Sequence, residues 1–237
     1  MLGSYPKIAF EILRKEGPIE FSRQSKNFAQ FHLIDRPVFW FKYREIRPKP
    51  REILLVDPTN VDYRIASRHI PDDAPPYGII GGKWDLNKSH WKKGFFYGLI
   101  ERFEEDKQWE DTIYYQTLTK KLEKGKSIGV LDGPQTISNF KNYLTYLDKL
   151  YGNIKQNGYD KDSIITVSIG RNGEWIVHSG NHRLTIARII GIEEVPLKIK
   201  YRHKQWQDLR DDIDNNGLAE KHDKKLRDHP DIQNVLN

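Results

Sequence analysis

The feature that most constrains this chain is a strand-turn-helix pattern between residues 177 and 191. Val177 ends an apolar run, Gly180 provides a tight turn, and a short helix follows. Gly191 ends that helix, because a left-handed residue at a helix C-terminus is most often glycine. The pattern therefore predicts a strand that leads directly into a helix through a single glycine.

The turn itself predicts an anion site. Ser179, Gly180 and Asn181 are residue types that cap helices and leave main-chain N–H groups free. A helix N-terminus with free N–H groups beside an arginine attracts anions. His182 and Arg183 would add charge or hydrogen-bond donors. The residues alone therefore predict that this turn holds a phosphate or a carboxylate.

The same residues resemble a known family signature. Members of the ParB/sulfiredoxin superfamily carry Gly-x-(His or Arg)-Arg before a short helix, then a glycine and a Val-Pro strand. The matching residues here are Gly180-Asn181-His182-Arg183-Leu184, Ala187, Gly191 and Val195-Pro196-Leu197. The resemblance covers roughly residues 136–203, with one earlier strand at 52–56. It implies nucleotide binding: CTP as in partition proteins, ATP as in sulfiredoxins, or ADP or ATP as in free-serine kinases.

What the resemblance implies for single residues is limited to those that match. Phosphate binding carries over to Gly180, His182 and Arg183, with Mg²⁺ accompanying the nucleotide. Asn181 stands where partition proteins commonly have an acidic residue and where the sulfiredoxin reaction needs a cysteine. The chain has no cysteine, which excludes that reaction, disulfides and thiolate metal sites. The motif could also be a retained scaffold in which Arg183 pairs with a carboxylate.

The surrounding pattern predicts an α+β protein, and the resemblance implies a small mixed sheet with packed helices. Residues 136–157 carry a single apolar seam at helical spacing, which predicts the longest helix. A strand at 164–169, a hairpin turn at 171–174 and a strand at 175–177 then lead into the signature. A further strand covers 195–201, so the order of elements fits the family.

The predicted domain organisation has three parts. Residues 1–51 form an N-terminal extension packed on the core. Its aromatic segment at 31–43 either packs on the core or presents rings and basic side chains to nucleic-acid bases. Residues 52–214 form the ParB/sulfiredoxin-like domain, with a helical insertion at about 62–135. Residues 215–237 are polar and charged and form a peripheral tail.

The insertion contributes three candidate site residues. A glycine pair at 81–82 precedes Lys83 and Asp85, a cation that could contact phosphate and a carboxylate that could contact substrate or Mg²⁺. The alternative is a glycine turn with a surface lysine and a capping aspartate. Residues 89–105 predict a helix with an aromatic stripe, in which Gly94 and Gly98 indicate close packing on one face. Glu101 on this helix is the second candidate for a catalytic carboxylate.

Two functions remain open at this point. The first is nucleotide or phosphate binding by a ParB-like protein, extending to an NTP-dependent phosphotransferase or NTPase that acts on a small molecule. The second is a DNA-binding, partition-like or nuclease-like protein of the same family. Only about 34 residues follow position 203, which is short for a helix-turn-helix domain, and the net charge of +6 is spread along the chain.

Composition adds several expectations about location and partners. No apolar run approaches the ~20 residues of a membrane span, and the N-terminus has no signal-peptide core. We therefore expect a cytoplasmic protein without membrane association. The eight histidines are scattered, and no spacing predicts a metal site. The sequence leaves the choice of nucleotide and the oligomeric state open.

Overall fold

The computed structural model describes residues 52–66, 69–72, 74–75, 77–131, 133–218 and 224–236. The chain divides into two compact units, Met1–Lys49 and Pro50–Asn237, and all described residues belong to the second. The expected N-terminal extension and its aromatic segment at 31–43 therefore lie outside the described residues.

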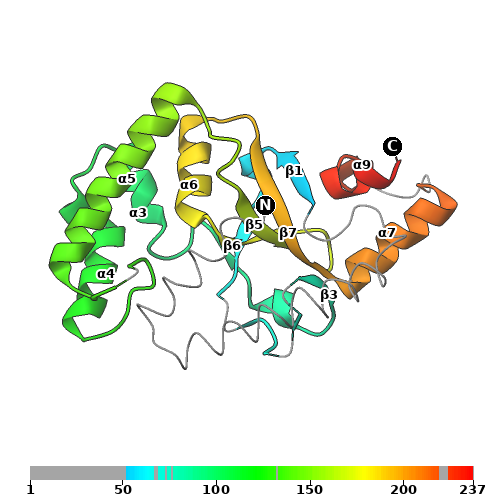
Figure 1. Cartoon of the computed structure of the whole chain (residues 1–237), viewed down its shortest axis with the longest axis horizontal. Coiled ribbons are helices and arrows are strands. Elements are labelled where there is room, and N and C mark those ends of the chain that lie inside the picture. Colours follow the sequence, from blue (N-terminus) through cyan, green and yellow to red (C-terminus); the bar gives the residue numbers. More distant parts are fainter. Residues whose placement is uncertain are drawn as a thin grey trace, which may run out of the picture. The chain divides into compact units, whose positions relative to one another are not determined.

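The strands of the described part form one mixed sheet (Figure 1). They are β1 (Ile53–Val56), β2 (Tyr63–Arg64), β3 (Gly78–Ile80), β4 (Ser89–His90), β5 (Ile165–Ile169), β6 (Trp175–Ser179) and β7 (Val195–His203). Their order is β1-β7-β5-β6-β2-β4. β7 runs parallel to β5 and antiparallel to β1, while β3 pairs with the C-terminal end of β7. β5 and β6 form the antiparallel hairpin that leads into the signature.

Helices lie on both sides of the sheet (Figure 1). The α-helices are α3 (Tyr97–Phe103), α4 (Ile113–Glu123), α5 (Ile137–Asn157), α6 (Asn181–Ile190), α7 (Lys204–Asn216), α8 (Lys224–Arg227) and α9 (Pro230–Leu236). Short 3₁₀ turns are η2 (Pro58–Asn60), η4 (Trp84–Asn87) and η5 (Trp109–Asp111). Buried residues of α6, α7 and α9 join the sheet in one core, and α3, α4 and α5 enclose a second.

The expected α+β class and the central elements are confirmed. Thr136 caps α5 by accepting a hydrogen bond from the main-chain N–H of Asn139 at 3.2 Å. The buried seam of α5 includes Phe140, Leu144 and Leu147, as the spacing predicts. β5, the hairpin, β6, α6 and β7 then follow in the predicted order.

The expected helical insertion at about 62–135 is helical only in part. Its first part, up to residue 90, adds the short strands β2, β3 and β4 to the sheet. The helix expected over 89–105 is wrong in its first half, because β4 occupies 89–90 and Gly94 adopts a left-handed φ of 78°. The close packing expected at Gly98 is confirmed, since a Cβ there would overlap the main-chain nitrogen of Tyr114 on α4.

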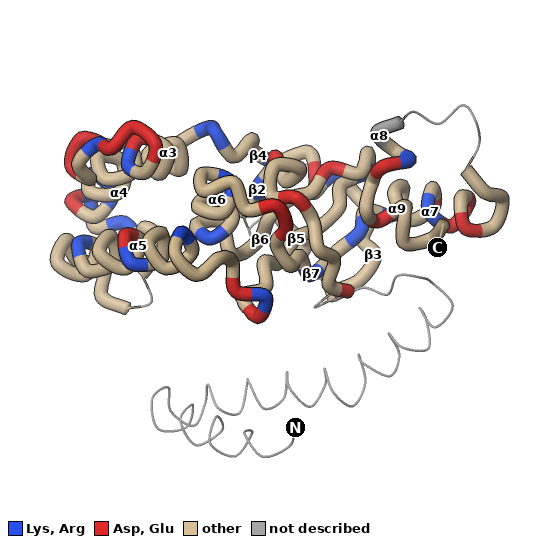
Figure 2. The backbone as a smooth tube through the Cα atoms, turned by 90° about the horizontal axis from the view of Figure 1, so that it is seen from above, with Lys and Arg blue, Asp and Glu red and all other residues tan. Residues whose placement is uncertain are grey.

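The C-terminal region is not the peripheral tail that its composition indicates. α9 packs against α7 (Figures 1 and 2), and the side chain of Asp231 is completely buried. Its carboxylate accepts hydrogen bonds from Arg202 at 2.7 Å and from the indole of Trp206 at 2.8 Å, and pairs with Arg210 at 3.2 Å. Burial alone would raise the pKa of Asp231, but the two arginines hold it at about 2. This paired charge fixes α9 to the core.

Candidate functional site

The predicted site turn lies at the end of β6. A single glycine, Gly180, joins Ser179, the last residue of β6, to Asn181, the first residue of α6. Gly180 has φ 88° and ψ 17°, a left-handed conformation that strains any residue with a Cβ. A Cβ at this position would also lie 3.1 Å from Cγ1 of Ile165. The first intrahelical bond runs from the N–H of Leu184 to the carbonyl of Gly180 at 2.9 Å. The main-chain N–H groups before it are left without intrahelical acceptors.

Arg183 lies over this turn without a carboxylate partner. Its Nη2 donates to the carbonyl of Ile164 at 3.3 Å and would lie 3.4 Å from a Cβ at Gly180. Within the described residues, Arg183 forms no ion pair. Burial raises the pKa of Tyr159 to about 12, and the charge of Arg183 opposes that rise, which places the guanidinium near the phenol. The turn therefore carries a cation that the described part of the chain does not neutralise.

The side chains next to Gly180 are accessible. Ser179 is exposed and Asn181 is half-buried. No side chain accepts a hydrogen bond from the first turn of α6, so its N–H groups are not capped from within. Ser179, Gly180, Asn181 and Arg183 are thus brought together as the sequence predicts.

The side chain of His182 has a different role from the one predicted. Its Nε2 is 2.7 Å from the hydroxyl of Tyr114, and its Nδ1 is 3.2 Å from the hydroxyl of Tyr143. The ring of Phe96 packs on it with centroids 5.0 Å apart. Burial lowers the pKa of His182 to about 4, so the ring is neutral at pH 7. The imidazole therefore links α6 to α4 and α5 through hydrogen bonds. His182 contributes its main-chain N–H, and not its side chain, to the start of the helix.

Asp85, the first candidate catalytic carboxylate, is held in a buried ion pair. It receives hydrogen bonds from Nη2 of Arg171 at 2.7 Å, Nε at 2.9 Å and the main-chain N–H at 3.0 Å. Burial raises its pKa, but the hydrogen bonds from Arg171 outweigh this and lower it overall. Arg171 lies in the β5–β6 hairpin, so the length of β6, about 16 Å for a strand of this size, separates Asp85 from Gly180.

Glu101 and Lys83 also lie outside the turn. Glu101 accepts hydrogen bonds from the main-chain N–H of Ile113 at 2.7 Å and from Nζ of Lys107 at 3.0 Å. Burial raises the pKa of Glu101, but these two bonds lower it overall, so the carboxylate caps the start of α4. Lys83 is exposed and directly precedes η4, next to Asp85. The structure therefore does not bring the three insertion residues to the signature.

One residue near the signature was not predicted. Arg64 pairs in register with Val177 of β6 and lies with its guanidinium 4.8 Å from the ring of Phe96. It donates to the carbonyl of Lys93 at 3.2 Å, while its Nε is buried without a partner among the described residues. Burial lowers its pKa. A two-residue strand leaves no periodic signal in the sequence, so nothing there marked this arginine.

Two further features of the described residues concern metal binding and membrane spanning. No group of three or more histidine, aspartate or glutamate side chains there could hold a metal ion. None of the helices described is both long and apolar enough to cross a membrane. Comparison of the chain with protein-family models, curated proteins and solved structures finds no match. The ParB/sulfiredoxin resemblance therefore rests on the signature residues themselves.

Proposed function

We propose that this chain binds a nucleotide, or another phosphorylated small molecule, at the start of α6, as a protein of ParB/sulfiredoxin type. One observation carries the proposal: the left-handed turn at Gly180 leaves uncapped N–H groups beside Arg183, whose charge no described carboxylate neutralises. A helix N-terminus carries roughly half a positive charge, which adds to that of the guanidinium. An anion at this place would satisfy both.

A phosphate would be held mainly by the main chain. Its oxygens would accept hydrogen bonds from the N–H groups of Asn181, His182 and Arg183. The guanidinium of Arg183 would add a charge-assisted bond, and the exposed hydroxyl of Ser179 stands at the rim. Mg²⁺ would accompany a di- or triphosphate through the phosphate oxygens. The side chain of His182 would contribute by fixing the first turn of α6 against the tyrosines.

The geometry favours binding over phosphoryl transfer. A phosphotransferase or NTPase positions its attacking hydroxyl or water with a nearby base. Asp85 and Glu101, the two expected candidates, are occupied by Arg171 and by the start of α4. We therefore prefer a nucleotide-binding protein or switch to a transferase. DNA binding is the alternative function that the test must distinguish.

The test is a thermal-shift screen of the purified chain against CTP, ATP, ADP and GTP with Mg²⁺. A ligand at 100 times its Kd adds about 2.7 kcal/mol to stability, which is roughly 5–11 °C in a chain of this size, at about 2–4 °C for each kcal/mol. We expect a shift for at least one nucleotide in the wild type and in Lys120→Ala, which removes an exposed charge on α4. The shift should disappear in Arg183→Ala.

Two results would refute this function. A thermal shift of equal size in Arg183→Ala would show that the nucleotide binds at a place other than the signature turn. The absence of any shift, together with binding of duplex DNA in a fluorescence-anisotropy titration, would favour the DNA-binding alternative.

A further inference from the structure

β1 forms one edge of the sheet, and its outer main-chain groups are free (Figure 1). In an antiparallel pair of strands, only every second residue bonds the partner strand. Leu55 lies opposite Pro196, which has no N–H, so this pair is an unbonded one. The N–H of Ile199 bonds the carbonyl of Glu52, which agrees with this alternation. The N–H and C=O groups of Ile53 and Leu55 therefore point away from β7, and neither residue has another bond within the described chain.

The side chains of the same two residues are open to solvent. Ile53 is 48% exposed and Leu55 is 49% exposed. Natural proteins usually protect an edge strand with a lysine, a proline or a bulge on that strand. β1 carries none of these, so free N–H and C=O groups lie beside two exposed aliphatic side chains. Such an edge is suited to an extended segment that adds to the sheet as a further strand.

The sheet face that these side chains share is basic. Ile53 lies opposite Lys198 on β7, and Lys200 follows on the same side of that strand, because Ile199 between them lies in the core. Both lysines are half-buried, and within the described residues neither forms an ion pair. Glu52, directly before β1, faces the opposite side by the same alternation. The face therefore carries positive charge that no described carboxylate neutralises.

This charge decides between two occupants of the edge. A second copy of the chain would pair β1 with β1 about a two-fold axis, which keeps both open faces on one side of the joined sheet. The lysines of two copies would then share one face, and like charges on one sheet face are destabilising. A segment with acidic side chains would instead neutralise them. It would lie two strand spacings, about 10 Å, from Lys198, and a lysine and a glutamate side chain together bridge that separation.

We propose that β1 is a docking site for an extended acidic segment of another protein. The segment adds to the sheet as a strand beside Ile53 and Leu55, and its carboxylates pair with Lys198 and Lys200. Main-chain hydrogen bonds and the two aliphatic side chains hold the segment, while the lysines select its charge. The proposal does not depend on the anion site at Gly180.

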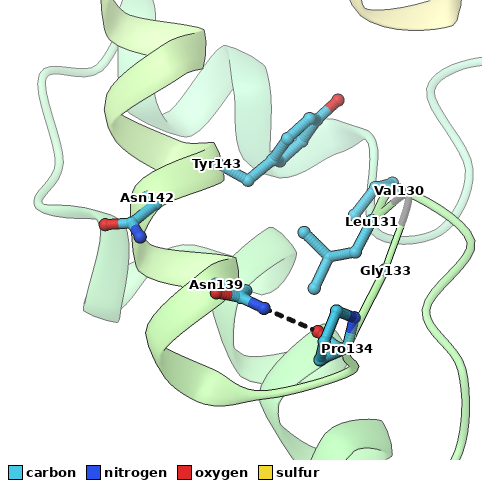
Figure 3. Close-up of a pocket in the computed structure, with 7 residues that line it drawn as sticks. All are labelled: Val130, Leu131, Gly133, Pro134, Asn139, Asn142 and Tyr143. Carbon is cyan, nitrogen blue, oxygen red and sulfur yellow. Dashed lines mark hydrogen bonds between the residues drawn. The ribbon is translucent and has the colours of Figure 1, made fainter.

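A pocket of about 350 Å³ at the start of α5 is a second place where a segment could bind (Figure 3). Its lining side chains are apolar, tyrosine or asparagine, and none is charged. One of them, Asn139, donates to the carbonyl of Pro134 at 2.9 Å, the bond drawn in Figure 3. Since this pocket offers no cation to an acidic segment, it serves as the comparison site, and the exposed Asn142 in its lining is the position to substitute.

The test measures binding of fluorescein-labelled hexapeptides to the full chain by fluorescence anisotropy. The acidic probe alternates valine and glutamate. One comparison peptide has lysine in place of glutamate, and another is the acidic peptide with a methylated main chain, which cannot donate hydrogen bonds. We expect the acidic probe to bind the wild type at least ten times more tightly than either comparison. Lys198→Glu should reverse the preference between acidic and basic peptides, whereas Lys120→Glu, exposed on α4, should leave it unchanged.

Leu55→Pro tests the strand edge. It removes the outward N–H of residue 55 but no hydrogen bond to β7, so the sheet should still form. We expect the acidic probe to bind this variant at least ten times more weakly than the wild type. Asn142→Asp places a negative charge in the pocket of Figure 3 and should leave the affinity unchanged.

Four results would overturn the proposal. The first is no binding of the acidic probe to the wild type at about 1 mM protein, and the second is equal affinity for the acidic and basic peptides. The third is a loss of affinity in Asn142→Asp without a loss in Leu55→Pro, which would assign the probe to the pocket. The fourth is a wild-type dimer in sedimentation velocity that Leu55→Pro dissociates, which would assign the edge to a second copy. The comparison among peptides uses the wild type, so it decides the question even if a variant does not fold.

Discussion

The stability of the fold should decrease as the pH falls from 7 to 5, because two histidines are held neutral. Burial lowers the pKa of His182 to about 4, and burial together with the charge of Lys200 lowers that of His178 to about 4. In the unfolded chain a histidine has a pKa near 6.5. Between these values the unfolded state binds more protons, so the free energy of unfolding falls as the pH is lowered. At pH 5, each of these two histidines should lower the free energy of unfolding by about 2 kcal/mol.

The contribution of His182 can be isolated by substitution. His182→Gln keeps a hydrogen-bonding side chain between Tyr114 and Tyr143 but removes the titration. The variant will be less stable at pH 7. The decrease in its free energy of unfolding between pH 7 and pH 5 should nevertheless be about 2 kcal/mol smaller than the decrease in the wild type. The pKa of Glu52 is raised by burial, which opposes the trend in both proteins equally.

Urea unfolding followed by tryptophan fluorescence at pH 7, 6 and 5 measures these differences. His178→Gln is the matched control, because it removes the other buried imidazole and should reduce the loss by a similar amount. An identical loss in the wild type and in His182→Gln would show that His182 is not buried as a neutral ring. The anchoring of α6 to the helices of the second core would then be wrong.

Four further substitutions test packing and charge. Gly98→Ala should destabilise the fold by about 1–3 kcal/mol in urea unfolding, because its Cβ meets the backbone of α4. Gly152→Ala, an open position on α5, should be neutral or stabilise by up to about 1 kcal/mol. Asp85→Asn should cost about 1–3 kcal/mol by weakening the bonds from Arg171, with unchanged nucleotide affinity in calorimetry. Asp231→Ala should cost about 3–5 kcal/mol, since it leaves buried arginine charge without its partner; a loss below 1 kcal/mol would contradict this.

The elements around the signature could be predicted because each one carries a local signal. α5 has a capping threonine, an apolar seam and a closing glycine, and its bounds agree with the sequence within one residue. The turn at Gly180 and the end of α6 at Gly191 both require left-handed backbone, which glycine adopts most easily. Such signals lie within a few residues of the feature that they specify.

The remaining features depend on partners far away in the chain. β2 has two residues, too few for an alternating pattern, so the position of Arg64 could not be foreseen. The side chain of His182 forms hydrogen bonds with Tyr114, 68 residues away in the sequence, and with Tyr143, 39 residues away. No local sequence pattern predicts either contact. Asp231 lies in a polar segment, and composition does not show that its charge is buried with two arginines.

The distribution of paired charge distinguishes the two ends of the central hairpin. At the turn of the hairpin, Asp85 and Arg171 neutralise each other, and the arrangement serves stability. At the opposite end, Arg183 donates to the carbonyl of Ile164 and pairs with no carboxylate of the described residues, beside N–H groups that no described side chain caps. A protein selected for stability alone would gain by placing a carboxylate there, because partly buried charge is costly when unpaired. No described carboxylate pairs with Arg183, and this difference from the paired Asp85 is the reason why we propose the anion site at the signature turn.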